Sequence, residues 1–114
     1  MSDARLPAHL EVSGILRAVE AEGGFATVLA KGERDAGTIL VVCCVNGQNN
    51  RLFERMPQLD GTRGWKLVRN QDSINPEEFS HYLSRRREQD RDIWVVELDI
   101  VRAERFIGLD PEKD

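Results

Sequence analysis

Residues 38–45 constrain the fold of this chain more than any other segment. They read Thr-Ile-Leu-Val-Val-Cys-Cys-Val, so apolar side chains occupy both alternating positions of an extended strand. Successive side chains of a strand point to opposite faces, and β-branched residues favour strands. We therefore expect a central strand that is buried on both faces, and an element of the fold or another subunit must cover each face.

Two amphipathic helices are predicted on either side of a strand-rich middle. The first covers residues 9–22 and ends at Gly23 and Gly24, because glycine readily adopts the left-handed conformation that stops a helix. The second begins with Asn75 as its cap and Pro76 in its first turn. Their apolar stripes consist of Val12, Ile15, Leu16 and Val19, and of Phe79, Tyr82 and Leu83.

Five strands are expected, at residues 25–31, 38–45, 51–56, 65–69 and 93–100. Connections rich in Gly and Asn are typical of hairpins, so the first four strands should form an antiparallel meander. The sequence thus predicts one α+β domain over residues 1–114, with this four-stranded antiparallel β-meander plus a fifth strand. Two main helices should pack on one face, and a short C-terminal helix should cover residues 102–107. Residues 1–5 and 110–114 should be frayed.

Composition and charge exclude some classes of function. The length of 114 residues suits one domain, and no apolar run approaches the ~20 residues of a membrane helix. The start of the chain lacks the pattern of an export signal, so we expect a cytoplasmic protein. The adjacent Cys43 and Cys44 are the only cysteines, which excludes a disulfide framework. The net charge of −4 makes nucleic acid an unlikely partner.

The loop 31–37, Lys-Gly-Glu-Arg-Asp-Ala-Gly, is the first candidate site. It joins the first two predicted strands and is longer than a tight hairpin requires. Its glycines let backbone N–H groups approach an anion, and Lys31 and Arg34 would balance the anion's charge. The candidate ligand-binding residues are Lys31, Arg34, Asp35 and Gly37. A solvated hairpin tip of the same composition is the alternative interpretation.

Acidic residues form two further candidates. Glu97 and Asp99 share one face of the last strand, where such a pair can bind a metal or share a proton, although an exposed strand end looks the same. Glu54 shares a face with apolar neighbours, so it needs a partner if it points inward, and cross-strand pairing on a wet face is the alternative. No motif predicts a catalytic residue, a metal site or a cofactor.

Six segments together resemble a known family. They are RLPAHLEV (5–12), GGFATVLAKG (23–32), DAG (35–37), YLSRRR (82–87), ELD (97–99) and AERFI (103–107). The chain resembles a family of short, uncharacterised alphaproteobacterial proteins, a domain of unknown function of about this length. The resemblance covers essentially the whole chain and implies a bacterial cytosolic protein, but it implies no activity, cofactor or catalytic residue.

Three functions remain open on the sequence. The leading prediction is a non-enzymatic cytoplasmic binding or interaction module, which either self-associates as a homodimer or binds a protein partner. The alternative is a protein that binds a small molecule or anion, and perhaps acts on it as an enzyme, through the loop 31–37. The weaker alternative is RNA binding through the arginines, which outnumber the lysines.

Overall fold

The computed structural model describes residues 6–57, 59, 63–70 and 76–109. Its elements are α1 (Ala8–Ala21), β1 (Phe25–Ala30), β2 (Ile39–Val45), β3 (Gln48–Pro57), β4 (Arg63–Asn70), α2 (Pro76–Gln89), β5 (Trp94–Asp99) and the 3-10 helix η1 (Ala103–Ile107). The predicted α+β class is confirmed, with five strands, two main helices and a short C-terminal helix. The predicted cap Asn75 and the predicted frayed ends, 1–5 and 110–114, lie outside the described residues.

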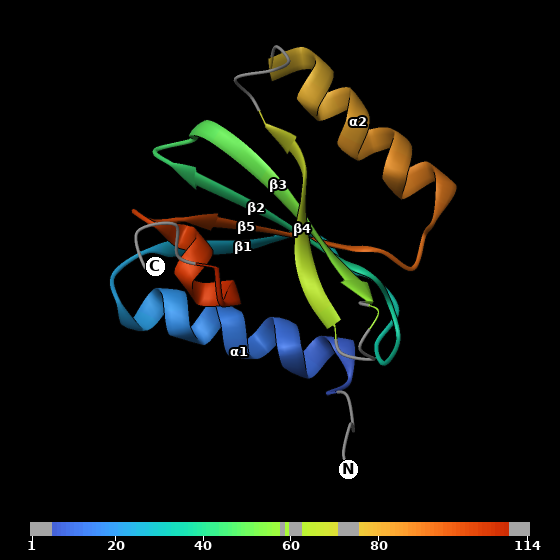
Figure 1. The fold of residues 1–114 in the computed structure, drawn as a ribbon, viewed down its shortest axis with the longest axis horizontal. Coiled ribbons are helices and arrows are strands. Elements are labelled where there is room, and N and C mark those ends of the chain that lie inside the picture. Colours follow the sequence, from blue (N-terminus) through green and yellow to red (C-terminus); the bar gives the residue numbers. More distant parts are fainter. Residues whose placement is uncertain (1–5, 58, 60–62, 71–75, 110–114) are drawn as a thin grey trace.

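The five strands form one mixed sheet in the order β1-β5-β2-β3-β4 (Figure 1). The predicted meander is correct from β2 to β4, where neighbouring strands are antiparallel. It is wrong for β1, because β5 lies between β1 and β2, antiparallel to the first and parallel to the second. Since β5 begins with Trp-Val-Val, buried on both faces, a central position satisfies its backbone and its side chains together.

The two main helices cover opposite faces of the sheet (Figure 1), whereas the sequence predicted both on one face. Helix α1 and η1 pack against one set of alternating β2 side chains, Ile39, Val41 and Cys43. Helix α2 places Phe79, Tyr82 and Leu83 against the other set, Leu40 and Val42. The physical reason is the double-sided apolar character of β2, which is buried from Ile39 to Cys44. One helical layer would leave half of this strand in water.

Strand β3 holds each covering element by one ion pair. On the α1 side, Arg55 contacts Glu11 of α1 at 2.8 Å, and Arg51 pairs with the buried Glu104 of η1. On the opposite side, Glu54 pairs with Arg86 of α2. Alternation along the strand explains this division, because neighbouring side chains point to opposite faces.

No helix within the described ranges is long and apolar enough to cross a membrane.

Helix α1 ends where the sequence predicted. Gly23 follows the C-cap residue Glu22 and lies in the left-handed region with φ of 88°, and its N–H donates to the carbonyl of Glu20. The chain then enters β1 at Phe25, so this turn sets the start of the edge strand.

Candidate functional site

Strand β1 forms an edge of the sheet and leaves apolar side chains exposed. It pairs with β5 on one side and has no strand of the described fold on its other side. Its sequence, Phe-Ala-Thr-Val-Leu-Ala, contains no charged residue. Phe25 is 74% exposed, and Val28 and Leu29 are 38% and 43% exposed. An edge of this kind is a template for another strand, so β1 is a candidate interaction site.

The regular part of this edge is short. Residues Phe25 to Val28 pair in register with Asp99 to Val96, and the register shifts between Val28 and Ala30. An irregularity of this type twists a strand end away from further pairing. The segment of β1 that pairs with β5 in regular register is therefore Phe25 to Val28, and Leu29 lies at its irregular end.

The loop 31–37 passes closely over the start of β5. A Cβ atom on Gly32 or on Gly37 would collide with the carbonyl oxygen of Asp92. The N–H of Glu33 donates to that same oxygen at 2.9 Å, and the indole N–H of Trp94 donates to the carbonyl of Glu33 at 2.8 Å. The glycines therefore allow two segments of backbone to approach closely.

The middle of the loop caps the first helix. The N–H groups of Ala8 and His9 donate to the carbonyls of Asp35 and Arg34, each at 2.9 Å. The carboxylate of Glu33 accepts hydrogen bonds from the N–H groups of Asp35 at 3.0 Å and Ala36 at 2.6 Å. Helix α1 has no side-chain cap, so these carbonyls satisfy donors that a helix start leaves free.

The four predicted residues of the loop do not gather at one point. Lys31 lies toward α2 at the end of β1, whereas Arg34 and Asp35 lie at the start of α1, on the other face of the sheet. Gly37 is buried against Asp92. The role of the loop in ligand binding stays a prediction.

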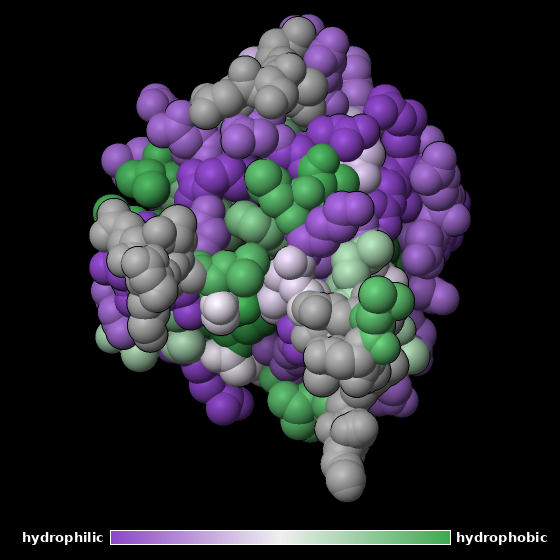
Figure 2. Space-filling model, viewed as in Figure 1, coloured by the Kyte–Doolittle hydropathy of each residue, from purple (hydrophilic) through white to green (hydrophobic). Residues whose placement is uncertain are grey.

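Lys31 lines a groove of about 400 Å³ between the end of β1 and the C-terminal half of α2. The polar side chains of the groove belong to Lys31, Ser84, Arg87, Glu88, Asp90 and Arg91. Figure 2 shows that hydrophilic residues gather over α2, at the upper right of the view. The groove is thus a polar concavity beside an apolar edge.

The predicted acidic pair lies at the far end of β5. Asp99 accepts a hydrogen bond from the N–H of Asn46 at 2.7 Å, and Glu97 accepts one from the thiol of Cys44 at 3.6 Å. Burial raises the pKa of Cys44 to about 12, helped by the negative charges of Glu97 and Asp99. Within the described ranges no three His, Cys, Asp or Glu side chains form a group that could hold a metal ion. A site at Glu97 and Asp99 stays a prediction.

Cys43 lies on the other face of β2 and is also a free thiol. Burial raises its pKa, and the nearby carboxylate of Glu104 acts in the same direction. Thiolates rather than thiols are nucleophiles, and the raised pKa values keep both buried cysteines in the thiol form at neutral pH. They pack as small apolar residues in the core.

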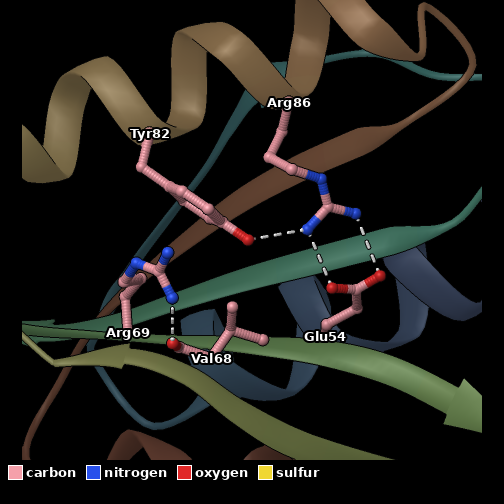
Figure 3. A network of polar contacts seen from close by, with 5 residues as sticks. All are labelled: Glu54, Val68, Arg69, Tyr82 and Arg86. Atoms are coloured by element: carbon pink, nitrogen blue, oxygen red, sulfur yellow. Dashed lines mark hydrogen bonds and ion pairs between the residues drawn. The ribbon is translucent and has the colours of Figure 1, made fainter.

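A cluster of aromatic and charged groups joins α2 to β3 and β4 (Figure 3). The guanidinium of Arg86 donates to both carboxylate oxygens of Glu54, at 2.8 and 2.9 Å, and to the hydroxyl of Tyr82 at 3.0 Å. The hydrogen bond to Glu54 raises the pKa of Arg86. The guanidinium of Arg69 lies 4.2 Å from the centre of the Tyr82 ring. Glu54 therefore points toward α2 with a partner, and this cluster fixes the helix in place.

The groove residues of α2 were missed at the level of sequence. Arg85, Arg86 and Arg87 point in different directions around the helix, as three consecutive residues must. Arg86 reaches Glu54, whereas Arg87 lines the groove. The signal that could have found part of the groove is the spacing of Ser84 and Arg87, which places them along one side of a helix.

Comparisons with known proteins agree with this fold. Residues 6–108 match the family described as "Protein of unknown function (DUF1491)". A crystal structure of a DUF1491 family protein from Caulobacter crescentus is 33% identical, with a TM-score of 0.78 over 90% of this chain and 94% of that one. A protein from A. tumefaciens, solved in solution, is 29% identical, with a TM-score of 0.72 over 93% and 95% of the two chains.

An NMR structure of a DUF1491 family protein from Caulobacter crescentus is also 33% identical, with a TM-score of 0.77. It covers 92% of this chain and 94% of that one. No curated protein matches this sequence. The resemblance found in the sequence segments is confirmed, and the chain belongs to the DUF1491 family.

Proposed function

We propose that this chain is a non-enzymatic interaction module of the cytoplasm, and that it self-associates through the edge strand β1. The observation that carries the proposal is an uncharged edge strand with Phe25, Val28 and Leu29 exposed. Apolar side chains on an open edge lose contact with water when another strand pairs there, and the backbone gains partners for its outward N–H and C=O groups.

A second copy of this chain is the occupant that the charges favour. Two identical strands related by a two-fold axis pair antiparallel, so the start of one lies beside the end of the other. Glu20 and Glu22 precede β1, and Lys31 follows it. Antiparallel pairing therefore brings Glu20 of one copy toward Lys31 of the other, whereas Glu22 keeps its own partner, Arg105. The strand has no charge of its own, so no like charges meet at its centre.

The state of the cysteines supports a reducing compartment. Cys43 and Cys44 are both free and buried in the core. Proteins of oxidising compartments commonly use cysteines in disulfides, whereas cytoplasmic proteins keep them as thiols.

Sedimentation equilibrium over a range of protein concentrations tests the self-association. We expect the wild type to shift from monomer to dimer as its concentration rises. The double variant Phe25→Lys, Leu29→Lys should stay monomeric, because it removes apolar contact and sets like charges against each other across the axis. Phe25 is 74% exposed and Leu29 is 43% exposed, so circular dichroism should show an unchanged fold.

Leu67→Lys is the matched control, since Leu67 is 47% exposed on the other edge strand, β4. This variant should dimerise like the wild type. A wild type that remains monomeric at every concentration would overturn the proposal. So would a double variant that dimerises as strongly as the control.

A further inference from the structure

The arginines of this protein fall into two groups by their contacts. Several have a carboxylate partner, among them Arg51, Arg55, Arg86 and Arg105. Arg87 and Arg91 have no such partner among the described residues, and neither has Lys31. These three cations line the same groove. Cations that gather around a concave site raise the local concentration of anions.

We infer that this groove binds a small anion that carries a phosphate group, a function separate from the proposed self-association. Two arginines, one lysine and the hydroxyl of Ser84 line the groove, and they supply donors from three separate segments of the chain. That set suits a tetrahedral group with several terminal oxygens better than a planar carboxylate with two. Arginine side chains match phosphate oxygens in pairs through their forked donors.

The rest of the groove limits the size of the ligand. Glu88 and Asp90 also line it, so three cations and two anions leave an excess of one positive charge. A long polyanion would meet these carboxylates, whereas one phosphate group can lie beside the cations. The floor includes Ala30 and the buried Ile93, which can contact a small apolar part of the ligand.

The groove joins segments that are distant in the sequence. Lys31 follows β1, Arg87 lies in α2, and Arg91 precedes β5. Arg87 also lies in the last turn of α2, and Arg91 follows the end of the helix at Gln89, where the helix dipole favours cations. If the two arginines only stabilise the end of the helix, their substitution lowers the free energy of unfolding. Added phosphate then has no effect on their surroundings.

Titration with inorganic phosphate, followed by NMR of the backbone amides, distinguishes the two roles. Chloride at matched ionic strength serves as the reference. We expect saturable shifts at Lys31, Ser84 and Arg91. In the double variant Arg87→Gln, Arg91→Gln, binding should weaken by about tenfold or more, since charge-assisted hydrogen bonds are lost. Arg17→Gln, exposed on α1, is the control and should bind phosphate like the wild type.

Three results would overturn the inference. The first is chemical-shift changes that do not saturate with phosphate or that spread over the whole surface. The second is phosphate binding by the double variant Arg87→Gln, Arg91→Gln that is as tight as that of the wild type. The third is equally strong binding of succinate, which would remove the preference for phosphate. The variant Phe25→Lys, Leu29→Lys keeps Lys31, Arg87 and Arg91 and frees Lys31 from the partner's acidic group, so it should bind phosphate at least as tightly as the wild type. Failure of the groove and failure of the β1 interface are then separate outcomes.

Discussion

The two edges of the sheet differ in how they meet solvent. At one edge, β4 carries Lys66 and Arg69. Two arginine guanidinium groups near this edge also lie over aromatic rings. Arg55 is 4.9 Å from the centre of the Trp65 ring, and Arg69 is 4.2 Å from that of Tyr82. At the other edge, β1 is uncharged and its apolar side chains are exposed.

Exposure alone does not distinguish these edges. Leu67 of β4 is 47% exposed, slightly more than Leu29 of β1 at 43%. The difference is the charge around each exposed side chain. A lysine or arginine on an edge strand makes pairing with another strand costly, because the charge would lose water. Strand β4 has this protection, whereas β1 carries no charge. Both edge strands have one irregularity of register, so register does not separate them.

The largest expected effect is on the free energy of unfolding, and it tests whether the two edges of the sheet differ only in their surface side chains. Leu98 lies in β5, paired with Ala26 of β1, and is fully buried. Leu98→Ala should lower the free energy of unfolding by about 2–5 kcal/mol, because it removes buried methyl groups and leaves a cavity. Leu67→Ala on β4 should cost less than about 1 kcal/mol. Urea unfolding of the two variants measures both values.

Equal losses of unfolding free energy in the two variants would contradict this prediction. They would mean that Leu67 at the β4 edge is packed as deeply as Leu98 of β5. A loss at Leu98 alone would show that β1 rests on a rigid core. Its exposed side chains are then a surface feature and no sign of loose packing.

Local sequence patterns predicted the elements of this fold but not all of their neighbours. The helical spacing of Val12, Ile15 and Val19 identified α1, and all three are buried. The double-sided apolar pattern of 38–45 identified a central strand. The position of β5 was missed because pairing between strands far apart in the chain leaves no local periodicity. The face covered by α2 was missed for the same reason, as either face of β2 is apolar.

The candidate sites show a similar limit. Composition marked 31–37 as unusual, but glycines that admit an anion and glycines that admit a neighbouring backbone look alike in a sequence. In the structure Gly32 and Gly37 approach Asp92, a residue from a distant part of the chain. The groove beside Lys31 likewise needs α2 and the start of β5, which only the tertiary fold brings to β1.

The next effect tests how the end of β1 is held. Gly32→Ala should destabilise the protein by about 1–3 kcal/mol, because the new Cβ meets the backbone carbonyl of Asp92 and must displace it. Hydrogen exchange at Thr27, whose backbone pairs with Glu97 of β5, should then speed up, whereas exchange in β4 should change little. Gly14→Ala is the control of opposite sign. Gly14 is exposed in α1 with open space around it, so alanine there should stabilise by about 0.5–1 kcal/mol. If exchange in β1 and β4 rises equally, the loop does not hold β1 in particular.

The smallest effect at neutral pH concerns the polar end of β5 beside β1. Glu97 is paired in register with Thr27 of β1, and it accepts the hydrogen bond of the Cys44 thiol. Burial and the two nearby carboxylates raise the pKa of this thiol from its ordinary value of 9.0 to about 12. Between these values the unfolded chain releases the proton while the folded protein keeps it. Stability from this thiol is therefore complete below pH 9 and declines as the pH rises toward 12.

Urea unfolding at neutral pH and above pH 9 measures this dependence, with Cys44→Ala as the matched variant. The wild type should lose stability more steeply with rising pH than the variant, because the variant has no thiol to ionise at this position. Lysine and tyrosine titrations are common to both proteins and cancel in the difference. Identical slopes would show that the Cys44 thiol ionises equally in the folded and unfolded chains. The end of β5 beside the β1 edge would then be open to water, and the contrast between a firmly packed interior and an exposed edge would fail at that end of the sheet.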